Sequence, residues 1–383
     1  LYHTWRYLAL FSVRYCPKII SAKQIQRQFN FLKMVAALSI AVLIIMVVVF
    51  LIADEPLDAL GHFFLGPFDS VRHLGNIIEN ATPVLFTGIA TCLLFAAGDV
   101  TLVGEGAVYL GGFIGGAVAV TLPIESKLLS LVAVLAAALA GGLLALIPAI
   151  ARRKFRCDPF VFSLLMNYVV LYIGVYVLNY KLHDYSYTSG VATAMFPDSA
   201  VLDSLVPKTS VNIGFFVGLL CAGTAWFFMY RTRWGYNAQL IRSNENFAKY
   251  VGVNIGKIGL LVAFLGGLVA AMGGAVDVLG KSPRFSWVAL PGYGWDGFMV
   301  ATLAYYNPAL VPFAALFLGY IRTGAQILNL RSDIPLELIS AIQAIIILMI
   351  ASKAMMNKLQ QRKIEEQTRL RQKAVNEQEV AGV

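Results

Sequence analysis

The chain has 383 residues, of which 58% are hydrophobic and only 13% are charged, and its mean hydropathy is +0.72. Soluble domains are roughly 45–50% apolar and about 25% charged, so this composition excludes a water-soluble enzyme, a disordered protein and a disulfide-rich secreted module. The length is better divided by the ~20 residues that a helix needs to cross a bilayer.

The formal net charge of +9 comes mainly from four basic clusters, at residues 1–33, 151–157, 231–257 and 353–383. These clusters lie between apolar runs, which is the distribution that the positive-inside bias gives to cytoplasmic loops. The pattern argues for contact with membrane lipid and against a nucleic-acid partner.

The chain begins with residues 1–33, where aromatic and aliphatic side chains alternate with cations. They predict a basic amphipathic segment at the cytoplasmic surface of the membrane. We expect no cleaved signal peptide, because the first long apolar run starts near residue 34 with no small-residue cleavage site nearby. Residues 57–75 predict an interfacial segment on the outer face.

Ten apolar runs predict ten membrane crossings, at about 34–53, 81–97, 105–122, 128–150, 160–180, 211–230, 258–279, 294–306, 309–328 and 336–352. If the chain starts in the cytoplasm, ten crossings place all four basic clusters and both termini on the cytoplasmic side. The predicted fold class is all-α, a polytopic transmembrane helical bundle. It comprises the interfacial segment 1–33, a transmembrane domain at 34–352 and a charged cytoplasmic tail at 353–383.

Residues 97–106 interrupt the apolar pattern with Asp99, Glu105 and three glycines. In hydrocarbon, non-helical backbone survives only where protein or a wet cavity satisfies it. Ionisable groups at such a break mark a solute path. A short cytoplasmic turn with solvated acids accounts for the same residues equally well.

A second break, at residues 291–297, precedes the shortest apolar run. Glycine permits the sharp break, and we expect Asp296 to cap a half-helix whose free N–H groups face a ligand. An external loop with an ordinary cap is the alternative. Arg322 needs a carboxylate or carbonyl partner if it lies at depth. Asn167 is a candidate for the path or for hydrogen bonding between helices.

The sequence contains no recognisable catalytic set. It has no HExxH, GxSxG, SxxK or GxxxxGK[ST] arrangement, and its four cysteines show no CxxC spacing. We therefore predict no catalytic residue, no metal site and no cofactor in this chain. A polypeptide with ten predicted crossings and no predicted catalytic residues is expected to transport a solute.

The third basic cluster contains a candidate helix. Asn244 is positioned to cap a helix through Phe247, Ala248 and Tyr250, and Gly252 is positioned to end it. Such a short, basic helix between two crossings is either a surface linker or a peg that docks into a soluble partner.

Several of these motifs, in order, resemble one permease family. Residues 244–253 resemble the N-x-x-A-A-R-Y-x-G-I coupling segment of ABC importer permeases that serve simple sugars, nucleosides and branched-chain amino acids. Residues 81–88, 97–106 and 292–304 resemble that family's A-T-P-L-x-x-T-G, A-G-x-x-N-I-G-x-E-G and G-Y-G-F-D-G-I-A-V-A-L-L motifs. Thr101 stands where the family has Asn.

The resemblance implies a permease subunit of an ATP-binding-cassette importer in the bacterial cytoplasmic (inner) membrane. It would move a small polar solute by alternating access, with nucleosides first and simple sugars as the alternative. The implied partners are two ATPase subunits that bind the ATP, a second permease chain, identical or homologous, and a lipoprotein or periplasmic solute-binding receptor. An alternative of another class is an ion-coupled secondary transporter in which Asp99 and Glu105 bind ions or protons.

The resemblance also distributes the candidate residues between two sites. The solute path is expected near Asp99, Thr101, Glu105, Asn167, Tyr293, Trp295 and Asp296. The contact with the ATPase is expected to involve Asn244, Phe247, Ala248, Tyr250 and Gly252.

Overall fold

The computed structural model describes Phe50 and residues 56–331, with the exception of residues 189 and 206–208. The predicted amphipathic segment, the first and last predicted crossings and the charged tail lie outside the described residues, apart from Phe50. The account below concerns the one compact unit that contains the described part.

This unit is built from helices, and its described residues form no β-sheet, so the all-α prediction is confirmed. Its elements are α3 (Pro56–Phe64), η1 (Gly66–Phe68), α4 (Val71–Leu94), α5 (Val103–Thr121), α6 (Leu128–Phe155), α7 (Pro159–Lys181), α8 (Gly214–Arg231), α9 (Arg233–Ser243), α10 (Glu245–Tyr250), α11 (Ile255–Lys281), α12 (Tyr293–Leu303) and α13 (Val311–Arg331).

Seven of these helices are long and apolar enough to cross a membrane, and they match seven of the ten predicted crossings: α4, α5, α6, α7, α8, α11 and α13. The predicted run at 294–306 corresponds to α12, which has 11 residues and rises only ~16 Å. Helix α12 is therefore too short to cross a bilayer unaided.

The segment 57–75, predicted to be interfacial, is divided between α3, η1 and the start of α4. Helix α4 begins at Val71 because the Ser70 side chain accepts a hydrogen bond from the His73 backbone N–H at 3.2 Å. A serine in this role satisfies one of the unpaired donors of a helix start. The helix therefore begins ten residues before the apolar run at 81–97 that predicted it.

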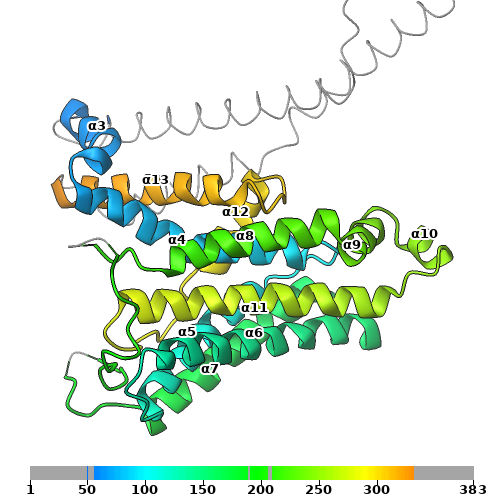
Figure 1. The fold of residues 1–383 in the computed structure, drawn as a ribbon, viewed down its shortest axis with the longest axis horizontal. Coiled ribbons are helices and arrows are strands. Elements are labelled where there is room, and N and C mark those ends of the chain that lie inside the picture. Colours follow the sequence, from blue (N-terminus) through cyan, green and yellow to red (C-terminus); the bar gives the residue numbers. More distant parts are fainter. Residues whose placement is uncertain (1–49, 51–55, 189, 206–208, 332–383) are drawn as a thin grey trace, which may run out of the picture. The chain divides into compact units, whose positions relative to one another are not determined.

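Helices α4 and α11 form the centre of the unit. Every residue of α4 from Ala81 to its end is buried, and α11 packs against α4, α5 and α6. In Figure 1, α11 lies between α4 and α8 on one side and α5 to α7 on the other, and α3 and α10 lie at opposite ends. We call these the α3 end and the α10 end.

Glycines allow α5 and α11 to approach until backbone meets backbone. A Cβ atom on Gly111 would lie 2.1 Å from the Ala271 carbonyl oxygen, and one on Gly274 would lie 2.0 Å from the Val108 carbonyl oxygen. Membrane helices associate through such small residues because lipid supplies no hydrophobic drive between them.

We expect Gly274→Ala to lower the thermal stability of the detergent-solubilised protein, because the added methyl group overpacks the α5–α11 contact at a cost of about 1–3 kcal/mol. Gly223→Ala in α8 is the matched control, since no atom lies within 4 Å of its Cβ position. Equal melting temperatures for the two variants would contradict this packing account.

Candidate functional site

The predicted crossing at 294–306 is the short helix α12, and a non-helical segment precedes it. Residues 282–292 leave the end of α11 and run back along α5. The Phe285 ring lies 6.0 Å and 5.7 Å, between centroids, from the rings of Tyr109 and Phe113. The Tyr109 hydroxyl also donates to the Trp287 carbonyl at 3.4 Å. These contacts bring the start of α12 into the interior of the bundle.

The buried carboxylate of Glu105 caps the start of α12. One carboxylate oxygen accepts from the Gly292 N–H at 2.6 Å, and the other accepts from the Gly294 N–H at 2.5 Å. The Trp295 N–H contributes a further hydrogen bond. Only 2% of Glu105 is exposed. A carboxylate at this position also meets the positive end of the helix dipole.

This geometry corrects the prediction for Asp296. The residue before α12 is Gly292, which has a φ of +83° and no side chain to form a cap. Asp296 lies in the first turn of α12 and forms an ion pair with Arg322 of α13. The cap therefore comes from another helix, and the N–H groups expected to face a ligand are occupied by Glu105. The predicted need of Arg322 for a carboxylate partner is confirmed.

Two side chains of α7 form hydrogen bonds with backbone groups at the start of α5, where the helical pattern is interrupted. The side-chain oxygen of Asn167 accepts a hydrogen bond from the Gly106 backbone N–H at 3.0 Å. Its side-chain NH₂ group donates to the Leu102 backbone carbonyl at 2.9 Å. The Ser163 hydroxyl accepts from the Leu102 N–H at 2.9 Å. Of the two roles predicted for Asn167, the structure shows the hydrogen bond between helices. Ser163, which sequence reasoning missed, lies four residues earlier on the same face.

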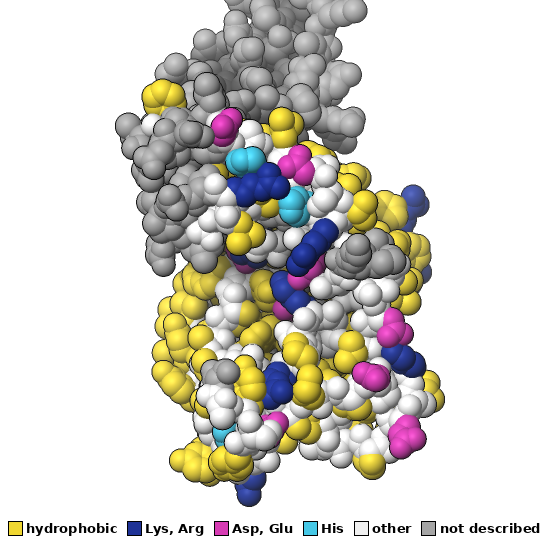
Figure 2. Space-filling model, turned by 90° about the vertical axis from the view of Figure 1, so that its left-hand side faces the viewer, with side chains coloured by type: hydrophobic (Ala, Val, Ile, Leu, Met, Phe, Trp, Pro, Cys, Tyr) yellow, Lys and Arg dark blue, Asp and Glu magenta, His cyan; other side chains and the backbone are white. Residues whose placement is uncertain are grey.

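A second polar group lies near the α3 end of α11. Asp277 is buried and hydrogen-bonds with the Tyr293 side chain of α12. One turn later, the Lys281 ammonium lies 3.1 Å from the Glu79 carboxylate of α4. Figure 2 looks onto this end and shows basic and acidic side chains gathered between apolar flanks.

The predicted path residues separate into two places. Glu105, Tyr293, Trp295 and Asp296 come together at the start of α12, where Trp295 is 45% exposed. Asp99 lies apart from them, at the α10 end. Buried Thr101 and Asn167 lie between these places, and the Thr101 hydroxyl accepts from the Val103 N–H at 3.3 Å.

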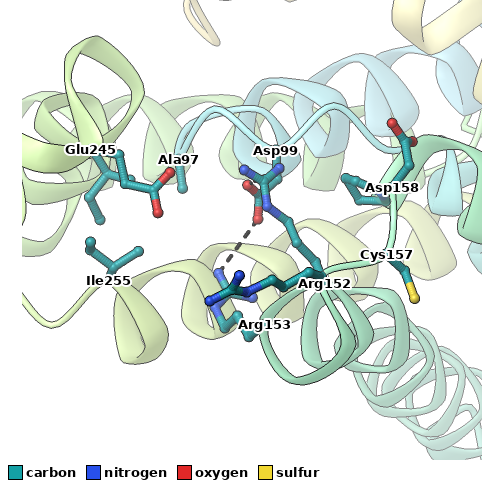
Figure 3. Close-up of a pocket in the computed structure, with 11 residues that line it drawn as sticks. Ala97, Asp99, Arg152, Arg153, Cys157, Asp158, Glu245 and Ile255 are labelled. Carbon is teal, nitrogen blue, oxygen red and sulfur yellow. Dashed lines mark ion pairs between the residues drawn. The ribbon is translucent and has the colours of Figure 1, made fainter.

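Asp99 lines a polar cleft of about 620 Å³ at the α10 end (Figure 3). Its carboxylate lies 2.6 Å from the Arg152 guanidinium and 3.5 Å from that of Arg153, at the end of α6. Burial raises the pKa of the Asp99 carboxyl, and the two arginines oppose that rise. The opposite wall includes Glu245, the first residue of α10. The cleft therefore joins the α4–α5 turn to α10.

The predicted short helix is confirmed as α10. The Asn244 side chain accepts from the Phe247 N–H at 3.0 Å, and Gly252 ends the helix with a φ of +82°. Ala248 is fully buried against the rest of the chain, whereas Tyr250 is 93% and Phe247 is 53% exposed. Phe247 and Tyr250 are thus the exposed aromatic side chains of α10, beside the exposed Glu245, Asn246 and Lys249.

This chain is similar to known membrane transport proteins over most of its length. The family described as "Branched-chain amino acid transport system / permease component" matches residues 73–351. Similar proteins include a guanosine ABC transporter permease of Bacillus subtilis (26% identical; 75% of this chain, 83% of the relative) and a glucose ABC transporter permease of Haloferax volcanii (28%; 77% and 80%). A nucleoside ABC transporter permease of Lactococcus lactis is 23% identical, covering 68% of this chain and 85% of the relative.

We expect Glu105→Ala to destabilise the protein strongly, because it leaves buried N–H groups of α12 without an acceptor, at about 1–3 kcal/mol each. Glu105→Gln, which keeps one carbonyl acceptor, is expected to lose less. The exposed Glu125→Ala serves as the control. Melting temperatures in detergent test the order; an Ala variant as stable as the control would refute the capping role.

For the buried ion pair, we expect Asp296→Ala alone to cost about 3–5 kcal/mol, because it leaves the Arg322 charge unpaired. The double variant Asp296→Ala with Arg322→Leu is expected to recover much of that loss. Breaking the exposed Lys127–Asp203 pair is the matched control, with an expected cost of about 0–1 kcal/mol. Additive single and double effects would contradict the pairing.

Proposed function

The chain belongs to the family of branched-chain amino acid transport system permease components, and we propose that it is the membrane subunit of a nucleoside importer driven by separate ATPase subunits. It is a multi-pass transport subunit of the ABC type and not an enzyme. The observation that carries the proposal is the family match over residues 73–351, which run from the first turn of α4 past the end of α13. The similarity to guanosine and nucleoside permeases supports the choice of solute.

A simple sugar is the second candidate, because a glucose permease is similar over a comparable share of the chain. An ion-coupled secondary transporter is not favoured. Glu105 accepts backbone hydrogen bonds from α12, and Asp99 is paired with two arginines, so neither carboxylate is available as a free ion ligand.

We propose that the α10 end lies in the cytoplasm. The two described basic clusters meet there, since Arg152, Arg153 and Arg156 share the cleft with α9 and α10 residues. The positive-inside bias places such clusters on the cytoplasmic side.

In this orientation, α10 faces the ATPase subunits, and Phe247 and Tyr250 dock into one of them. Two connections lead from this segment into the bundle. The Arg242 guanidinium of α9 lies 5.0 Å from the centre of the Tyr306 ring, just after α12. The cleft joins α10 to the turn before α5, whose Glu105 caps α12. The movement of the ATPase subunits as they close would thus be transmitted to α12 through both of these connections.

The proposed mechanism is alternating access, in which α12 is the two-state element. It packs on α4 and is bound to α13 by the Asp296–Arg322 pair. A shift of α12 between these neighbours would open the path toward one side at a time. A second permease chain and an external solute-binding receptor complete the proposed importer.

We expect proteoliposomes that contain this chain, its ATPase subunits and its receptor to take up radiolabelled guanosine when ATP is enclosed. An uncoupler should leave the uptake intact, and unlabelled guanosine should compete better than glucose. Uptake that continues without the ATPase subunits would overturn the proposal, and stronger competition by glucose would favour the sugar candidate.

We expect Tyr250→Ala, combined with Phe247→Ala, to reduce guanosine-dependent ATP hydrolysis at least tenfold, because the exposed rings of the docking helix are lost while Ala248 still packs the segment in place. Phe313→Ala, at an exposed aromatic residue of α13, is the control. Normal coupled hydrolysis by the double variant would show that α10 does not transmit the ATPase movement.

A further inference from the structure

The cleft at the α10 end contains one carboxylate that the structure leaves without a partner. Asp99 is paired with Arg152, and Asp158 caps the start of α7. Glu245, the first residue of α10, is exposed, and its side chain forms no ion pair or hydrogen bond among the described residues. In Figure 3 its carboxylate points into the cleft from the α10 side.

Arg153, in the last turn of α6, is a half-buried cation with donors to spare. Its Nη1 donates to the Ala149 carbonyl at 2.6 Å, and its Nη2 lies 3.5 Å from the Asp99 carboxylate. Its buried Nε has no hydrogen-bond partner. Because a guanidinium bonded to a carboxylate usually lies at about 2.7–2.9 Å, the contact with Asp99 is loose. A second carboxylate can therefore compete for Arg153.

Arg153 also contacts more than one element, so its choice of partner has structural consequences. It bonds to the backbone of α6, faces Asp99 in the α4–α5 turn and lies against α11, where a Cβ atom on Gly259 would collide with its Nη2. If Arg153 leaves Asp99, the turn is held to α6 by the Arg152 contact at 2.6 Å alone. The turn would then be less firmly attached.

The cleft gives α10 room to approach Arg153. Helix α10 packs mainly on α9 and on the start of α11, and the cleft of about 620 Å³ lies between it and the end of α6. Gly252, which ends α10, has no atom within 4 Å of its Cβ position. A push on α10 can thus narrow the cleft without displacing packed side chains at that point.

We propose that Glu245 is a positioning residue for transport, which takes Arg153 from Asp99 when the ATPase subunits close and push α10 toward the bundle. The α4–α5 turn, held by fewer contacts, is then free to shift together with α5, whose Glu105 caps α12. This inference rests on the function proposed above and names the residues through which α10 acts on the path. The pair formed with Glu245 stabilises one of two states, as coupling requires.

The structure favours Arg153 over the other two arginines of the cleft. Arg152 is engaged by Asp99 at close range, and Arg156 is exposed, where an ion pair contributes little. Only 22% of the Arg153 side chain is exposed, so water and salt screen a pair with it less. Burial raises the pKa of the Asp99 carboxyl, the arginines oppose this rise, and the charge of Glu245 adds to it. Glu245 therefore already acts across the cleft.

Cross-linking tests the approach of α10. In the full complex with its native cysteines replaced by serine, the pair Glu245→Cys and Arg153→Cys is treated with a short bifunctional methanethiosulfonate. We expect the complex trapped with ATP and vanadate to give at least fivefold more of the linked peptide, measured by mass spectrometry, than the nucleotide-free complex. Equal or lower yield in the trapped complex would overturn the proposal.

Variants without the charges test the exchange. We expect Glu245→Gln and Arg153→Gln each to reduce guanosine-stimulated ATP hydrolysis about tenfold, and the double variant to be no worse than either, because both remove one interaction. Glu245→Asp, which keeps the charge, should retain at least half of the stimulation. Arg156→Gln is the matched control and should behave as the unaltered chain. Additive effects of Glu245→Gln and Arg153→Gln would show that the two residues act independently and would refute the exchange.

Two further measurements separate this inference from a loss of folding and from the proposed function. Melting temperatures in detergent identify any variant that is merely unstable, and Glu245→Asp then decides whether the charge restores coupling. ATP-driven guanosine uptake by the unaltered complex, together with additive variants, refutes the exchange alone. State-dependent cross-linking without guanosine uptake supports the movement of α10 and refutes the nucleoside function.

Discussion

A backbone group inside a membrane must find its hydrogen bond within the protein, and the central part of this chain depends on how that demand is met. Two helices begin within the bundle, and each is capped by side chains of another helix. Asn167 of α7 bonds the start of α5, and Glu105 of α5 bonds the start of α12. The two caps act in series. The position of α12 is thereby fixed by α5, and that of α5 by α7.

The same series explains why α12 is suited to move as a unit. Its first turn is held by both Glu105 and Arg322, and the segment that follows it is held by Arg242 of α9. These are polar contacts between separate helices. Its packing contacts are close but small: a Cβ on Gly297 would lie 2.5 Å from the Thr87 side chain. Smooth glycine surfaces with a few polar attachments allow a helix to shift without repacking large side chains.

Hydropathy was sufficient to predict the long spans, because each is a local property of ~20 consecutive residues. The α10 cap was predictable for the same reason, since Asn244 and Phe247 lie three residues apart. The cap on α12 was not, because Glu105 and Gly292 are 187 residues apart and no local pattern joins them. Asp296 was therefore assigned the role that Glu105 has. Ser163 and Asn167 did carry a signal, two polar residues four apart in an apolar run, but the signal does not say which backbone they meet.

Charged side chains are mostly paired at one end of the bundle and mostly unpaired at the other. This difference supports the orientation we propose. At the α3 end, cations face carboxylates in the exposed or half-buried pairs Lys127–Asp203, Arg284–Asp184 and Arg331–Asp69. Such pairs contribute little to stability and leave no excess of one sign. At the α10 end, the only ion pairs of the described residues are those of Asp99, and the remaining cations lie unpaired or over aromatic rings. Unpaired cations are favoured beside the anionic lipids and negative potential of a cytoplasmic leaflet. That end is also where α10 exposes Tyr250. The excess of basic residues that orients the chain and the helix proposed to dock into the ATPase therefore lie on the same surface.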